Sequence, residues 1–96
     1  MEIDILADDL TVRLYWMEDR HFLGELVGVK WISDGGKEYL CAPRGQDQIY
    51  GLVMSDVQFS FEHQGRTFEG LGEMQNDNPG YKIECQGSIE PEATCR

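Results

Sequence analysis

The two histidines, His21 and His63, are the side chains of this sequence best suited to general acid–base chemistry near neutral pH. A hydrolytic triad would need one of them held against a Ser, Cys or Thr nucleophile. Both lie among charged or polar residues, in segments that we expect to be turns. The sequence contains no Gly-x-Ser-x-Gly elbow, no glycine-rich phosphate loop ending in Lys-Ser/Thr, and no His-Glu-x-x-His. We therefore expect no catalytic residue and no enzymatic activity.

The three cysteines, Cys41, Cys85 and Cys95, have a spacing that favours neither a zinc site nor a disulfide framework. Structural zinc sites take ligands in close pairs, and no two of the cysteines and histidines lie within four residues of each other. We expect no metal and no cofactor. Cys41 and Cys85 fall in predicted strands as small buried hydrophobic residues, whereas Cys95 falls in an accessible tail. A bond between Cys85 and Cys95 stays open.

Acidity is the feature that stands out from the background. The chain of 96 residues has 18 Asp and Glu against 8 Lys and Arg, which gives a formal net charge of −10. Such a surface repels nucleic-acid phosphate and anionic membranes, so neither is expected as a direct partner. A hydrophobic fraction of 41% and an aromatic fraction of 10% indicate a folded chain, with one modest core and one domain.

Apolar and polar residues alternate along most of the chain, which predicts β-strands. Any functional site would therefore be positioned by strands and the turns between them. The clearest hairpin joins 57–62 to 67–74 around the turn His63-Gln64-Gly65-Arg66, and Ser33-Asp34-Gly35-Gly36 predicts a second tight turn. Gly24 and Gly28 inside a strand indicate bulges or a bend. The other predicted strands cover residues 10–17, 22–32, 38–41 and 81–89, with Gln75 to Gly80 as a turn.

These elements predict an all-β fold: one small antiparallel meander of about six to eight short strands, closing into a barrel or a two-sheet sandwich. Residues 10–17 also fit a short N-terminal helix behind an Asp8 or Asp9 cap. The domain is expected to span 1–90, with a flexible C-terminal tail at 91–96.

The chain is expected to be cytoplasmic. Its longest apolar run, 22–32, is interrupted by Glu25 and Lys30 and is shorter than the ~20 residues of a membrane helix. The first ten residues lack the positive and apolar regions of a secretory signal.

The predicted strands place many carboxylates on one outward face. If Phe59 and Phe61 face the core, Glu62, Glu69 and Glu73 face water, and Glu84 joins them on the last strand. Neighbouring strands lie ~4.8 Å apart and positions i and i+4 of one strand ~13 Å apart, which is on the scale of phosphate separations in nucleic acid. Leu71, between two of the glutamates, is expected to be an outward apolar residue. A second acidic group, which two turns would bring to one end of the sheet, consists of Asp8, Asp9, Glu18 and Asp19.

In composition the chain is similar in kind to small acidic phage or plasmid inhibitors of nucleic-acid-handling complexes. The leading hypothesis is therefore a non-enzymatic inhibitor that docks on the basic groove of a protein or ribonucleoprotein, such as a CRISPR or restriction nuclease, in the manner of a DNA mimic. An immunity protein or antitoxin that neutralises one toxin is the alternative, with buried aromatic anchors. A third hypothesis is a small-ligand barrel whose pocket is lined by Trp16 and Trp31.

Overall fold

The structure is a computed structural model that describes residues 3–43, 55–77, 80–87 and 89–91. Within these ranges the chain forms strands and the turns between them, and no helix. None of the described segments could therefore cross a membrane as a helix. The strands are β1 (Ile3–Trp16), β2 (Phe22–Asp34), β3 (Lys37–Ala42), β4 (Ser55–His63), β5 (Arg66–Asp77), β6 (Gly80–Cys85) and β7 (Glu90–Pro91).

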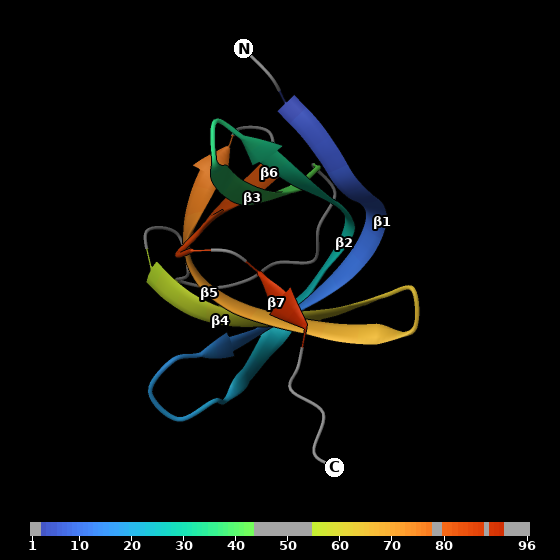
Figure 1. Ribbon diagram of the computed structural model, residues 1–96. Helices are drawn as coiled ribbons and strands as arrows, with labels where there is room; N and C mark the ends of the chain where they lie inside the picture. The colour runs from blue at the N-terminus through green and yellow to red at the C-terminus, as the bar shows by residue number, and fades with distance from the viewer. Residues whose placement is uncertain (1–2, 44–54, 78–79, 88, 92–96) are drawn as a thin grey trace.

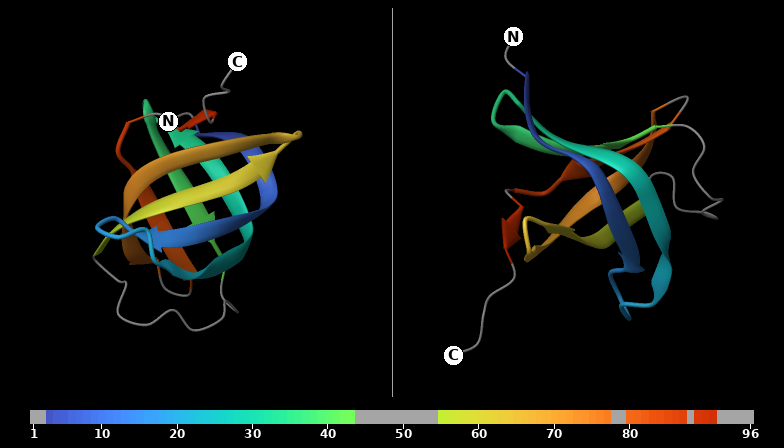
Figure 2. Two further views of the ribbon diagram at one scale, coloured as in Figure 1. Left: turned by 90° about the horizontal axis from the view of Figure 1, so that it is seen from below. Right: turned by 90° about the vertical axis from the view of Figure 1, so that its right-hand side faces the viewer.

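Six of the strands close into an antiparallel barrel (Figures 1 and 2). Strands β1, β2 and β3 form one meander, and β4, β5 and β6 form a second. The two meanders meet at both edges, where β1 pairs with β4 and β3 pairs with β6. The predicted all-β antiparallel fold is confirmed, and of the two architectures left open the chain adopts the barrel. Closure of the sheet explains this choice, because a barrel removes most of the unpaired strand edges.

Strand β1 starts earlier than predicted and contains no helical turn. It pairs with β2 from Ile3 onward, so the alternative of a short N-terminal helix is wrong. Asp8 and Asp9 form a bulge in place of a helix cap: between Ala7 and Leu10, β1 carries one residue more than β2. Asp9 has a φ of 55°, and its N–H donates to the Asp8 carboxylate at 2.7 Å. Pairing with β2 overrides the helical spacing, since strand propensity depends strongly on context.

Strand β2 bends at Gly28, as a glycine inside a strand predicts. Between Leu26 and Val29, β2 carries one residue more than β1. Gly28 has a φ of 67°, which is accessible to glycine at little cost. Each strand of the hairpin thus contains a bulge, and Figure 2 shows how the hairpin curls around the interior. Bulges increase local twist and bending, which a closed barrel requires.

The two tight hairpins lie where the sequence predicts them. Gly35 and Gly36 connect β2 to β3 with φ values of 62° and 88°, and Gln64 and Gly65 connect β4 to β5 with φ values of 53° and 76°. Positive φ at both central residues is typical of the two-residue turn whose twist matches that of the flanking strands. The turns therefore fix the register of both hairpins.

One face of each strand fills the barrel with apolar side chains. On β4 the residues that alternate inward are Val57, Phe59 and Phe61, as predicted. Trp31 and Phe68 pack against Phe61 with ring centroids 5.4 and 5.5 Å away. None of the described residues that are buried is polar or charged. The largest fully buried side chains are Phe59, Leu14, Leu26, Leu40, Met74, Ile83, Val12, Val29 and Val57.

Strand β5 continues into the region predicted as a turn. It runs through Gln75 to Asp77, and its pairing with β6 extends to the Asp77–Gly80 pair. Asn and Asp are generally depleted in strands, but cross-strand pairing decides the outcome here. Asn78 and Pro79 lie outside the described residues.

The predicted strand at 81–89 is shorter in the structure. Strand β6 ends at Cys85, and Gly87 follows with a φ of 79°. The chain then forms β7, in which Pro91 pairs with Phe68 of β5. Cys95 and the rest of the tail lie outside the described residues, so the question of a bond between Cys85 and Cys95 stays open.

Glu38 lies at one end of the barrel, where it joins three segments. Its carboxylate accepts a hydrogen bond from the Trp31 indole N–H at 2.8 Å and one from the Ile89 backbone N–H at 3.3 Å. Ile89 is buried. The contact therefore holds the segment before β7 against the barrel.

Candidate functional site

The predicted acidic residues of β4, β5 and β6 lie on the outside of the barrel. On β5, Glu69, Leu71 and Glu73 alternate with inward-facing Gly70 and Gly72. Leu71 is exposed to 36%, and the two glutamates are half-buried. Alternation along the strand therefore predicted this face correctly. The other two carboxylates of the set are the exposed Glu62 and the half-buried Glu84.

Three carboxylates lie in direct register across β4, β5 and β6. Asp56 pairs with Glu73, and Glu73 pairs with Glu84. Directly opposite residues of antiparallel strands have Cβ atoms about 5 Å apart, and like charges in such pairs are destabilising. We refer to Asp56, Glu73 and Glu84 as the carboxylate row.

The carboxylate row is only partly neutralised. Lys37 contacts Glu84, with Nζ and Oε2 3.2 Å apart. The Gln75 amide donates to Glu73 at 2.9 Å and to Glu84 at 3.3 Å. Among the described residues, Lys37 is the one cation at ion-pair distance from the row. Its hydrogen bond to Glu84 and its charge hold the pKa of that carboxyl below the ordinary value.

Substituting Lys37 by methionine is expected to raise the pKa of Glu84. The variant removes the hydrogen bond and the positive charge that favour the ionised carboxylate, and it leaves Glu73 opposite. A carboxyl whose pKa is lowered by folding stabilises the protein above its unfolded pKa, and this contribution is lost as the pH falls through the folded pKa. NMR titration of the Glu84 side-chain carboxyl would measure the shift, with exposed Glu62 as the internal control. An unchanged Glu84 midpoint in Lys37→Met would contradict the assigned ion pair.

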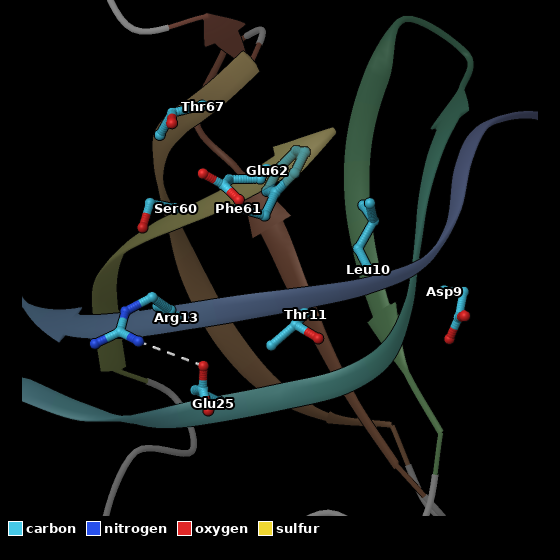
Figure 3. A pocket seen from close by; sticks show the side chains of 9 residues that line it. All are labelled: Asp9, Leu10, Thr11, Arg13, Glu25, Ser60, Phe61, Glu62 and Thr67. Carbon is cyan, nitrogen blue, oxygen red and sulfur yellow. Dashed lines mark hydrogen bonds and ion pairs between the residues drawn. The ribbon is translucent and has the colours of Figure 1, made fainter. Parts of the chain in front are cut away.

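Two neighbouring hollows are lined by predicted site residues. The larger of the two is lined by residues of β1, β2, β4 and β5 and has a volume of about 530 Å³ (Figure 3). Three carboxylates border it, those of Asp9, Glu25 and Glu62, together with the guanidinium of Arg13. A smaller hollow of about 180 Å³ shares Ser60 with it and is bordered by Glu69. Predicted site residues from β1, β4 and β5 thus border two neighbouring concave regions. The remaining lining residues of the larger hollow are Leu10, Thr11, Phe61 and Thr67.

Arg13 lines the larger hollow and contacts three neighbouring side chains. Its Nε donates to the Tyr15 hydroxyl at 2.9 Å, and its Nη1 lies 3.4 Å from Glu25 Oε2. Its guanidinium also lies over the Phe22 ring, 4.4 Å from the centroid. The hydrogen bond from Arg13 lowers the pKa of Tyr15. Arg13 is thus engaged by three neighbours, and among the described residues it pairs with Glu25 rather than with Glu62.

The second predicted acidic group does not come together. Asp8 and Asp9 lie within β1, whereas Glu18 and Asp19 lie in the turn after Trp16. Seven residues of strand separate Asp9 from the end of β1, about 23 Å at the usual rise. The prediction treated both aspartates as turn residues, but the bulge keeps them in the strand. Asp9 instead shares the larger hollow with Glu62.

The described histidines and cysteines are His21, His63, Cys41 and Cys85. Among the residues described, no three His, Cys, Asp or Glu side chains are placed to hold a metal ion. His63 is half-buried against Trp31 and Phe68, with ring centroids 6.4 and 6.3 Å away. It is therefore a packing residue at the end of β4 and not the turn residue that the sequence predicts. Burial raises the pKa of Cys85 to about 12, which keeps this thiol protonated near neutral pH.

Sequence reasoning missed Asp56, although a signal was present. The outward alternation of Gln58, Ser60 and Glu62 extends back by one step to Asp56. Its register with Glu73 depends on the β4–β5 hairpin, which the sequence also predicted. Counting back from the turn at 64–65 would have paired the two carboxylates.

Comparisons with protein-family models, with curated proteins and with solved structures gave no match for this chain. Function therefore has to be inferred from the surface of the barrel itself.

Proposed function

We propose that this protein is a non-enzymatic binding protein whose acidic outer face docks on the basic surface of a nucleic-acid-handling protein or ribonucleoprotein. Bound there, it would compete with nucleic acid, as an inhibitor of a CRISPR or restriction nuclease would. The observation that carries the proposal is the carboxylate row, with Glu69 further along the same face of β5. Competition by charge and by steric exclusion would be the whole mechanism.

The carboxylate row lowers the stability of the barrel by charge repulsion. Pairing like charges directly across strands is unfavourable, whereas alternating signs would stabilise the same sheet by roughly 0.2–1 kcal/mol per pair. Local rules are most often broken at functional sites. A basic partner would relieve the repulsion on binding, because its cations would lie opposite Asp56, Glu73 and Glu84.

Affinity capture at two salt concentrations tests the proposal. The immobilised protein is incubated with lysate of the cells that express it, washed at low salt and then at roughly 0.5 M salt, at which exposed charge contacts are strongly screened. We expect a nucleic-acid-binding protein in the high-salt eluate, and we expect added competitor DNA or RNA to prevent its capture. Capture of a partner that is reduced neither by added nucleic acid nor by the high-salt wash would contradict the proposal.

A second candidate is an immunity protein or antitoxin that binds one toxin through apolar anchors. The observation in its favour is the β1–β2 hairpin tip, where Trp16, Met17 and Phe22 are exposed to 37%, 39% and 43%. Exposed aromatic residues often anchor protein interfaces. In the capture experiment, such a partner would survive the high-salt wash.

The small-ligand hypothesis has less support from the geometry. Trp31 packs against Phe61 and Phe68, with both ring centroids 5.4 Å away. Neither of the two hollows described above is lined by a tryptophan.

A further inference from the structure

The first half of β1 has one paired edge. Strand β4 pairs with β1 over Val12–Trp16, whereas β2 pairs with β1 from Ile3 onward. Figure 1 shows the first half of β1 following β2 while β4 turns away into its hairpin with β5. Within the described part of the chain, Ile3–Thr11 therefore has no strand on the side opposite β2. An open strand edge presents N–H and C=O groups on which another chain can form a strand.

This edge exposes three large apolar side chains beside its aspartates. Ile3, Ile5 and Leu6 are exposed to 52%, 59% and 43%. Such residues gain most from being covered, because burial of a Leu or Ile side chain is worth about 1.5–3 kcal/mol. The edge thus offers both main-chain hydrogen bonds and apolar area.

The charges on the edge argue against a second copy of the chain as the occupant. In an antiparallel self-pair centred on Leu6, Asp4 of each copy would lie opposite Asp8 of the other. A shift of the register by one residue would place Asp4 opposite Asp9 in one direction, and Asp4 opposite Ala7 with Asp8 opposite Ile3 in the other. The first two of these three arrangements set carboxylates directly against each other, twice in each dimer, which is unfavourable, and the third gives neither aspartate a cation. The same aspartates favour an occupant that carries cations at the matching positions.

We infer that this edge of β1, residues Ile3–Asp9, binds an extended basic segment of a partner protein by strand addition. The segment would carry Lys or Arg on either side of a short apolar run, so that its cations face Asp4 and Asp8 and its apolar residues cover Ile5 and Leu6. Between Ile5 and Ala7, β1 carries one residue more than β2, so Asp4 and Asp8 lie closer together than the about 13 Å that four residues of regular strand span. Main-chain hydrogen bonds would supply affinity, and the flanking charges would set specificity. The inference does not depend on the carboxylate row.

Two synthetic peptides test the inference on the intact protein by NMR. One is a short run of alternating valine and threonine flanked by lysines, and the other has glutamates in place of the lysines. We expect the lysine peptide to shift the amide signals of Ile3–Asp9 and to slow their hydrogen exchange, with at least about tenfold weaker binding of the glutamate peptide. N-methylation of the lysine peptide at alternate residues removes its ladder donors and should abolish the effect.

Matched protein variants separate local pairing from overall charge. Asp4→Lys/Asp8→Lys should reverse the preference between the peptides. Glu18→Lys/Asp19→Lys, which changes the net charge equally at the hairpin tip, should leave the preference for the lysine peptide in place. The inference is overturned if the shifts map elsewhere than β1, if the N-methylated peptide binds equally, or if both double variants behave alike.

Discussion

Replacing both Glu69 and Glu73 by lysine is expected to abolish the salt-sensitive capture of a basic partner while leaving the barrel at least as stable as before. The two residues lie on the outward face of β5, with exposed Leu71 between them. The two lysines would repel a basic partner surface that the native glutamates attract. Like-charge contacts across an interface cost several kcal/mol. We expect affinity to fall by about a hundredfold or more at physiological salt.

The same double variant is not expected to lose folding stability. In the double variant, a lysine in place of Glu73 would lie between Asp56 and Glu84, where the native chain has a third carboxylate. Two repulsive cross-strand pairs would become attractive, so the free energy of unfolding should stay unchanged or rise by up to about 1 kcal/mol. Urea titration measures this directly. Gain of stability with loss of binding is the pattern expected where function and not folding selected the residues.

The matched control is Glu18→Lys/Asp19→Lys. It changes the net charge by the same amount at the β1–β2 turn, away from β5. The control should retain most of the capture. Equal loss in both double variants would show that total charge decides binding, and retained capture in Glu69→Lys/Glu73→Lys would rule out the face on β5.

Phe59→Ala is expected to destabilise the barrel by about 3–5 kcal/mol, a large part of the roughly 5–15 kcal/mol available to a small domain. The Phe59 side chain is fully buried, and its ring covers Gly70, where a Cβ atom would lie 2.6 Å from the ring Cζ. Glycine at this position allows the aromatic ring to approach the β5 backbone. The substitution would leave a cavity that the closed sheet cannot collapse to fill.

Denaturant unfolding followed by tryptophan fluorescence would measure the loss, since Trp31 packs within the same aromatic cluster as Phe61. Phe59→Leu is the control that keeps most of the volume, and it should cost much less. A loss below about 1 kcal/mol in Phe59→Ala would mean that the interior is loosely filled, and the small-ligand hypothesis would then regain support.

Some parts of the candidate site were accessible from local patterns. The alternation of Glu69 and Glu73 with Gly70 and Gly72 placed the glutamates outside, because the side-chain period of a strand is two. The turn at 64–65 fixed the register of β4 and β5, because two-residue turns with positive φ impose their own pairing. Both inferences depend on residues that are neighbours in sequence.

Other parts needed contacts between distant segments. The helical alternative for residues 10–17 was locally reasonable, and pairing with β2 on one side and β4 on the other decides against it. The sequence predicts His63 in a turn, but it ends β4 and packs against Trp31 of β2. The sequence groups Asp9 with Glu18, but in the structure Asp9 borders the same hollow as Glu62 of β4. Strand β4 pairs with the second half of β1. Spacing in the sequence does not predict these contacts between distant strands.

Composition and local spacing are enough to predict an acidic chain, antiparallel strands, the apolar face of β4 and β5, and the positions of the two tight hairpins. These properties follow from composition, from the two-residue period and from backbone preferences at single turns. Three features depend on contacts between distant segments: the closure of the strands into a barrel, the register of Glu84 with Glu73 and Asp56, and, among the described residues, the open edge at the start of β1. The reason is that register between strands far apart in sequence is set by how the whole sheet buries its apolar face, which no local segment specifies.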